Sequence, residues 1–147
     1  MAAYSFLNIS CQMVGPGIAS NLAAGAAAAE EGITVEPTTD KNVMTIGADG
    51  KGQHSLVADD SCKVTIRLLK TSPLNAALMI AYDIQTVSSA LHGINTFTLS
   101  DSARGDFSVI QQAAFKKRPT LTYAKEAGMM EWEFDGIQVN SVLGSGV

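Results

Sequence analysis

The sequence offers few side chains that could act as catalysts. His54 and His92 are its two histidines, and either could serve as a general base near neutral pH. Neither has a nucleophile or an orienting acid at a recognisable spacing. Glu131, Glu133 and Asp135 alternate along one segment, and paired carboxylates hydrolyse glycosides. The same alternation is typical of a solvent-facing strand, and no neighbour would raise the pKa of one carboxylate above the others. We therefore predict that the protein is not an enzyme.

The spacing of the cysteines and glycines does not indicate a metal, redox or nucleotide site either. Cys11 and Cys62 lie far apart and form no CxxC motif, so we interpret them as two buried, reduced thiols. The glycine-rich stretch GADGKGQ, at residues 47–53, resembles a phosphate loop only superficially, because no GK[ST] or helix follows it. The Asp49-Gly50 pair within this stretch instead favours a tight hairpin. We expect no cofactor and no metal.

Composition points toward association. The 147 residues suit one domain, which we take as residues 1–147, and only 16% are charged, against about 25% in typical globular domains. A surface poor in charge, at net charge −4, protects weakly against self-association. The basic residues are scattered apart from Lys116, Lys117 and Arg118, so no footprint for gripping nucleic acid is present. With no secretory signal or membrane span in the pattern, we expect a protein made in the cytoplasm and not inserted in a membrane.

The chain is organised around residues 62–90. Residues 62–70 alternate between apolar and polar side chains, which predicts a strand with one buried face. Ser72 and Pro73 then form a helix start, and apolar side chains at helical spacing predict a helix over about 73–87. Its apolar stripe is so wide that we expect protein around most of the helix, either from its own sheets or from a neighbouring subunit.

The remaining patterns predict a mainly β fold. Further strands are expected at 4–14, 33–36, 42–46, 53–58, 94–99, 106–117, 120–123 and 129–134. We expect a bulge within 106–117. The apolar phase changes after Asp135-Gly136, which fits either a hairpin or a bulge in one long strand.

Residues 15–32 are rich in Ala and Gly and supply few anchors for a core. We predict a long arm here, which is either an arm that orders on a partner or a loop without such a role. Residues 144–147 are expected to be a frayed tail.

Several segments together resemble the tail tube proteins of contractile-tailed bacteriophages. They are KNVMTIGADGKGQHSL, VTIRLLKTSPLNAAL, AFKKRPTLTYAKEAGMMEWEFDGIQV and AAAAEEGITVE, and the resemblance covers nearly the whole chain. It implies a β-sandwich or rolled β-barrel with one flanking helix. It also implies hexameric rings that stack into a tube for DNA ejection inside a contractile sheath. The implied fold is similar to that of the needle-forming ring protein of type VI secretion.

The resemblance also implies partners and a place of action. In the virion, copies of the chain would contact one another. They would also contact the tail sheath, tape-measure, baseplate and tail-terminator proteins. DNA would be non-specific passing cargo. We predict inter-subunit contacts at Ala23, Ala24, Gly25, Ala26, Asp49, Gly50 and Lys51, and a lumen-facing position for Glu131, Glu133 and Asp135.

Two alternatives stay open at this stage. The chain could be a tube or needle subunit of a related contractile injection system. It could also be a β-barrel that binds a small ligand, with Trp132 and Tyr82 in its pocket.

Overall fold

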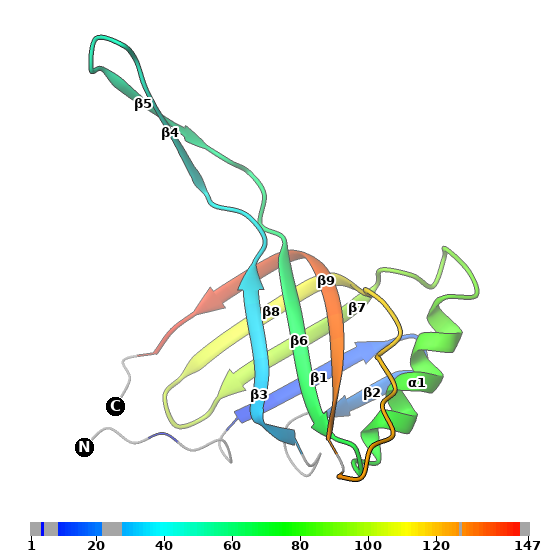
Figure 1. The fold of residues 1–147 in the computed structure, drawn as a ribbon. Coiled ribbons are helices and arrows are strands. Elements are labelled where there is room, and N and C mark those ends of the chain that lie inside the picture. Colours follow the sequence, from blue (N-terminus) through cyan, green and yellow to red (C-terminus); the bar gives the residue numbers. More distant parts are fainter. Residues whose placement is uncertain (1–3, 5–8, 22–27, 127, 145–147) are drawn as a thin grey trace.

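The structure is a computed structural model that describes residues 4, 9–21, 28–126 and 128–144. These residues form a seven-stranded antiparallel sheet, a separate two-stranded hairpin and one helix (Figure 1). The strands are β1 (Ile9–Gly15), β2 (Ile18–Asn21), β3 (Ala28–Pro37), β4 (Asn42–Ile46), β5 (Gly52–Leu56), β6 (Cys62–Leu69), β7 (Asn95–Asp101), β8 (Asp106–Phe115) and β9 (Met129–Val142), and the helix is α1 (Leu74–Gln85). The predicted mainly β fold with one helix is confirmed.

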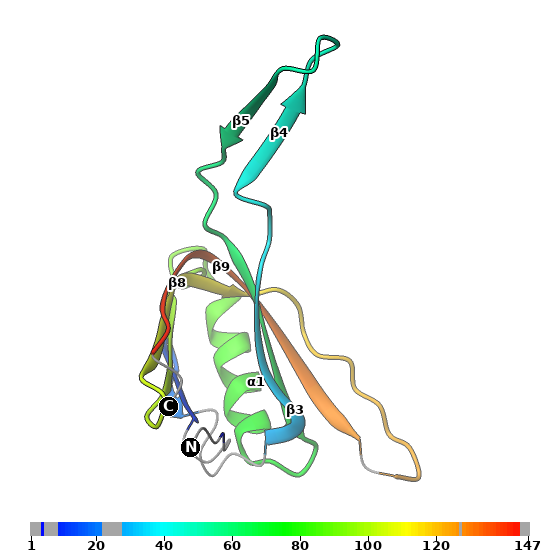
Figure 2. The same ribbon diagram turned by 90° about the vertical axis from the view of Figure 1, so that its left-hand side faces the viewer.

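The large sheet is curled and open. Its strand order is β2-β1-β7-β8-β9-β6-β3, so β2 and β3 are its two edges. Figure 2 shows the two halves of the sheet facing each other with α1 between them. Because β2 and β3 do not pair with each other, the described residues form no closed barrel, and the predicted closure is not observed.

A bend in β9 joins the two halves. Residues 129–136 of β9 pair with β6, and residues 134–142 pair with β8. A Cβ at Gly136 would lie 2.5 Å from Ile110 Cγ2 and 3.2 Å from Cys62 Sγ, so only glycine fits where β6, β8 and β9 meet. Of the two alternatives at Asp135-Gly136, the structure shows one long strand and excludes the hairpin, because β9 runs without interruption from Met129 to Val142. The predicted bulge in β8 is confirmed by a register shift against β7, next to Gln112 with its φ of 55°.

The core lies between the two halves and is built around aromatic rings. Phe134 packs against Phe97 and Phe115 with ring centroids 4.8 and 4.6 Å apart. Phe115 also contacts Trp132 at 6.0 Å and Tyr82 of α1 at 5.5 Å in edge-on geometry. Such offset arrangements are the ones that aromatic quadrupoles favour. The core thus fastens the helix to both halves of the sheet.

The helix begins where the sequence predicts it. Pro73 is the N-cap residue with φ −65°, and the Leu74 amide donates to Ser72 Oγ at 3.4 Å. The face toward the sheet buries Asn75, Leu78, Ala81 and Gln85. Helical spacing of these four residues explains why only one side of α1 reaches the core.

Two buried amide side chains anchor the ends of α1. Near its start, Trp132 Nε1 donates to Asn75 Oδ1 at 3.1 Å, and Asn75 Nδ2 donates to the Leu69 carbonyl at 3.0 Å. Near its end, Gln85 and Asn95 exchange two hydrogen bonds of 2.8 and 2.6 Å. Each buried polar group is therefore satisfied, which sets the position of the helix along the sheet.

The predicted arm from residue 15 to residue 32 is shorter in the structure. The turn at Gly15-Pro16-Gly17 leads into β2, which pairs with β1, and β3 already begins at Ala28. Gly17 has φ 82°, and a Cβ at Gly15 would lie 1.8 Å from Asn95 Oδ1. Glycine is thus needed for the turn and for a close approach to β7. Residues 22–27 lie outside the described residues.

Other boundaries also differ from the prediction. Residues 120–123 form no strand, because β6 and β8 already occupy both sides of β9 and leave the segment no edge to join there. In the first predicted strand, β1 begins at Ile9, and residues 5–8 lie outside the described residues. In the predicted tail, Gly144 N donates to Asp106 Oδ1 at 2.8 Å, and residues 145–147 are not described.

Candidate assembly surfaces

The β4–β5 hairpin projects away from the rest of the molecule (Figures 1 and 2). All ten residues of its two strands are exposed. At its tip the Gly47 amide donates to the Lys51 carbonyl at 2.7 Å, and Lys51 N donates to Asp49 Oδ1 at 3.1 Å. Gly50 has φ 85°, and nothing lies within 4 Å of where its Cβ would be. The predicted hairpin at Asp49-Gly50 is confirmed, and its contact with a neighbouring copy stays a prediction.

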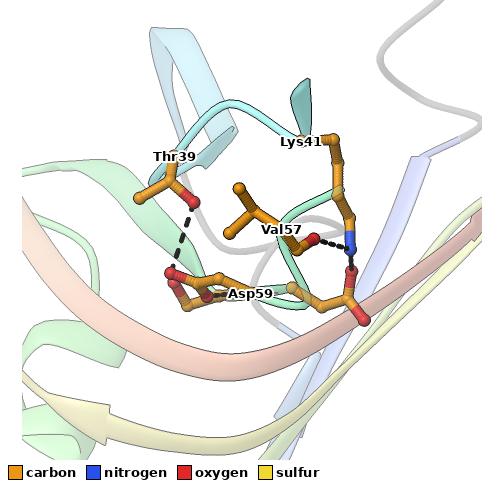
Figure 3. Close-up of polar contacts among 6 residues, drawn as sticks. Thr39, Lys41, Val57 and Asp59 are labelled. Carbon is orange, nitrogen blue, oxygen red and sulfur yellow. Dashed lines mark hydrogen bonds and ion pairs between the residues drawn. The ribbon is translucent and has the colours of Figure 1, made fainter. Parts of the chain in front are cut away.

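Polar contacts hold the base of the hairpin (Figure 3). Lys41 Nζ forms an ion pair with Asp60 at 2.5 Å and donates to the Val57 carbonyl at 3.2 Å. Thr39 Oγ1 donates to Asp59 Oδ2 at 3.3 Å. These polar contacts join the two chain segments that enter and leave the hairpin.

Asp59 also binds the segment that follows it. The Ser61 amide donates to Asp59 Oδ1 at 2.8 Å. Hydrogen bonds from the Ser61 side chain and amide lower the pKa of Asp59 below its ordinary value of 3.8, because they stabilise the ionised carboxylate. Asp59 therefore accepts these hydrogen bonds in its ionised form near neutral pH.

The two faces of the hairpin differ in polarity. Paired residues of antiparallel strands lie on the same face, so the pairs Met44–His54, Ile46–Gly52 and Asn42–Leu56 share one face. Met44, Ile46 and Leu56, which we term the apolar hairpin face, are 60%, 56% and 87% exposed. The opposite face carries Val43, Thr45, Gln53 and Ser55. Three exposed apolar side chains on a protruding hairpin point to a surface that another protein covers.

A second exposed apolar stripe runs along α1. Ile80 is 59% exposed, Ile84 is 38% exposed beside Gly17 of the β1–β2 turn, and Val87, just past the end of the helix, is 83% exposed. We expected protein around most of α1. Both halves of the sheet contact the helix, but Ile80 and Ile84 stay exposed in the single chain. A neighbouring subunit is the remaining source of cover that the sequence suggests.

The acidic residues of β9 lie on the outer face of the sheet beside cations from β6. Lys63 Nζ lies 3.2 Å from Glu133 Oε1, and Arg67 Nε lies 3.6 Å from Glu131 Oε2. Partial burial acts to raise the pKa of Glu133, but the hydrogen bond and positive charge of Lys63 outweigh it and lower the pKa. Asp135, which pairs with Lys63, shares this face. The three carboxylates thus belong to a surface of mixed charge.

The residues considered for chemistry do not come together. His54 lies on the hairpin, where Asn42 Nδ2 donates to its Nδ1 at 3.1 Å, and His92 lies in the loop after α1. Among the residues that the structure describes, no group of three His, Cys, Asp or Glu could hold a metal ion. Both cysteines are buried and unbridged. No described helix is both long and apolar enough to cross a membrane.

Two further predictions concern other residues. Trp132 is fully buried and Tyr82 packs on Phe115, so these two side chains belong to the core and form no ligand pocket. The predicted contact residues Ala23, Ala24, Gly25 and Ala26 lie outside the described residues. Sequence reasoning missed the apolar hairpin face, although only Thr45 separates Met44 from Ile46 and the Asp49-Gly50 turn places both on the same face as Leu56.

Comparison with known proteins gives a family and a fold neighbour. The family described as bacteriophage PhiTE tail tube protein matches residues 1–144. No curated protein matches the chain. Among solved structures, the chain is similar to the tube-terminating cap of the anti-feeding prophage, determined by cryo-EM, with 8% identity and a TM-score of 0.52. The similarity covers 98% of this chain and 93% of the cap.

Proposed function

The chain belongs to the bacteriophage PhiTE tail tube protein family, and from this premise we propose that it is the repeating subunit of a phage tail tube. Copies form rings, hexameric as the sequence resemblance implies, and the rings stack into a conduit for DNA inside a contractile sheath. Tape-measure, baseplate and tail-terminator proteins complete the assembly in the virion.

The apolar hairpin face is the observation that carries this proposal. Met44, Ile46 and Leu56 stand on a protruding hairpin, and each of these side chains is more than half exposed. A protruding element that fits a different surface on the next copy makes a head-to-tail contact, and such contacts generate rings or stacks. In our proposal the hairpin, including Asp49, Gly50 and Lys51 at its tip, lies at the contact between rings.

The sheet edges supply a second means of association. β2 and β3 are the ends of the strand order, so among the described residues each has one side without a partner in the large sheet. Unpaired edges are templates for strand addition from another chain. Joining these edges between neighbouring copies gives a continuous inner sheet, and in our proposal residues 23–26, between the two edge strands, contact the adjacent copy.

Negative-stain electron microscopy of the purified chain tests this function. We expect hollow rings and stacks of rings. A hairpin variant in which residues 43–55 are replaced by a short Gly-Ser linker should form rings that do not stack. A matched variant at the other proposed contact, Ala24→Glu, should weaken rings as well as stacks. Only separate particles of monomer size, at every concentration, would refute the proposal.

The cap-like fold suggests one alternative within the same class. The structural neighbour is named as the cap that terminates a tube. If this chain has the same role in a contractile injection system, the purified protein should form rings that do not stack. Stacks of many rings from the wild-type chain would exclude this role.

A further inference from the structure

The outward-facing side chains of the β1-β7-β8 half of the sheet carry no charge. One row across four paired strands is Gln12, Thr98, Val109 and Asn140. Their neighbours along the strands, such as Met13 and Phe97, are buried in the core, which places the row on the outside. The C-terminal part of β9, which pairs with β8, thus belongs to the same surface.

The next row continues this pattern. Ser10, Ser100, Phe107 and Val142 are paired in sequence across the same four strands. Gln111 and Gln138 face each other beyond the first row. We term the outward side chains of β1, β7, β8 and residues 138–142 of β9 the uncharged face.

The other half of the sheet is different. On its outer face β6 presents Lys63 and Arg67, and β9 presents Glu131, Glu133 and Asp135. The chain contains 24 charged residues, 10 basic and 14 acidic. The described strands of one half of the outer surface carry none of these charges, whereas β6 and β9 carry five on the other half, so the two surfaces differ in charge.

The composition of the uncharged face argues against a protein interface. Interface cores are enriched in Tyr, Trp, Phe, Met and Arg, and they are depleted in Ser. This face has Ser, Thr, Gln and Asn at most positions, and Phe107 is its one aromatic residue. Hydroxyl and amide groups hold water, so the face stays wetted when it encloses a channel, whereas apolar constrictions gate by losing water.

We propose that the uncharged face is the wall of the conduit. Duplex DNA moves along this wall without binding to it. This inference rests on the proposed tube. Duplex DNA presents a dense row of phosphates, and cationic side chains would hold it by releasing counterions. Hydroxyl and amide groups give no such hold, and they add no repulsion of the kind that carboxylates would. The face therefore replaces the Glu131–Asp135 surface as the wall.

Thiol labelling of assembled tubes tests the location. Cys11 and Cys62 give little background, because both are 1% exposed and burial raises the pKa of Cys11 to about 12. We would place single cysteines on the face as Gln12→Cys and Asn140→Cys, and on the charged surface as Glu131→Cys. Each would be treated with a small maleimide and with a maleimide on a large polyethylene glycol chain.

The expected labelling pattern is specific to a lumen. In intact tubes, the cysteines of Gln12→Cys and Asn140→Cys should react with the small maleimide but not with the large one. After the tubes have been dissociated into subunits, both cysteines should react with both reagents. Reaction with both reagents in tubes would place the face outside, and reaction with neither would place it at an interface. Either result, or the small-only pattern at Glu131→Cys, would overturn the inference. Failure to form tubes would instead refute the proposed function, and this inference with it.

A charge variant tests the cargo. Asn140→Lys adds one cation per subunit to the uncharged face, and Ala90→Lys adds one in the exposed loop after α1. Wild-type and Ala90→Lys tubes should retain no labelled DNA duplex. Asn140→Lys tubes should retain it at low salt, and with about six phosphate contacts the affinity should fall about a thousandfold between 50 and 200 mM salt. Equal retention by wild-type and Asn140→Lys tubes would overturn the inference.

Discussion

Removing the apolar hairpin face should prevent the stacking of rings without unfolding the subunit. The triple variant Met44→Ser, Ile46→Ser and Leu56→Ser replaces side chains that are 60%, 56% and 87% exposed. Burying a large apolar side chain is worth about 1.5–3 kcal/mol, so covering the exposed parts of these three is worth about 3–6 kcal/mol per subunit. A loss at the lower end of this range raises the concentration needed for rings to stack about a hundredfold.

The assay is the concentration dependence of assembly, followed by light scattering and checked by electron microscopy. Val43→Ser is the matched control, because Val43 is 50% exposed on the opposite face of the same hairpin. Thermal unfolding of the triple variant should match that of the wild-type monomer, since the hairpin strands contribute nothing to the buried core.

Two results would refute the reasoning. The triple variant could assemble at the wild-type concentration, which would mean that the face remains in water. Alternatively, Val43→Ser could impair assembly as strongly as the triple variant, which would mean that the polarity of the two faces does not decide the contact.

Three other predictions concern the subunit itself. Asn75→Ala leaves the buried Trp132 N–H without its partner and should lower the free energy of unfolding by about 2 kcal/mol. Unfolding in urea, followed by Trp132 fluorescence, measures this loss. The control variant Asn140→Ala, at an exposed position, should leave the free energy of unfolding unchanged, and equal losses in the two variants would contradict the prediction. Gly136→Ala should cost about 1–3 kcal/mol, because the new Cβ would lie 2.5 Å from Ile110 Cγ2, and an unchanged melting temperature would show that the bend in β9 tolerates a side chain. For Asp59, whose folded-state pKa is lowered, the stability contribution is present above the ordinary value of 3.8 and is lost as the pH falls through the folded-state value. The Ser61 amide resonance of the unassembled triple variant should therefore titrate with a midpoint below 3.8, and a midpoint at or above 3.8 would contradict the hydrogen bonding.

Local patterns predicted the elements whose residues supply their own signals. The alternation in residues 62–70 and the Ser72-Pro73 start give β6 and α1 within a few residues, because period and capping are local properties. Asp49-Gly50 gave the hairpin for the same reason, since a tight turn needs a residue with positive φ.

The misses depend on contacts between distant residues. β2 was missed because it is an edge strand whose pairing depends on Gly15 fitting against Asn95 of β7. Residues 120–123 have the composition of a strand, but the sequence does not show that β6 and β8 already pair with β9 on both sides. At Gly136 the sequence leaves a hairpin and one long strand open, because the choice depends on how Ile110 and Cys62 pack against that residue.

The surfaces were harder to predict than the elements. Alternation indicated that Glu131, Glu133 and Asp135 share a face, but not that Lys63 and Arg67 lie beside them, because cross-strand neighbours depend on register. The uncharged face is spread over four strands that are distant in sequence, so no single segment reveals it.

Sedimentation velocity of the purified wild-type chain over a wide concentration range tests the central claim most directly. The claim is that the subunit is completed by other copies of itself, at its hairpin, its helix and its sheet edges. We predict a discrete species of ring size, followed by faster-sedimenting stacks as the concentration rises. A single species of 15.4 kDa at every concentration would contradict the claim.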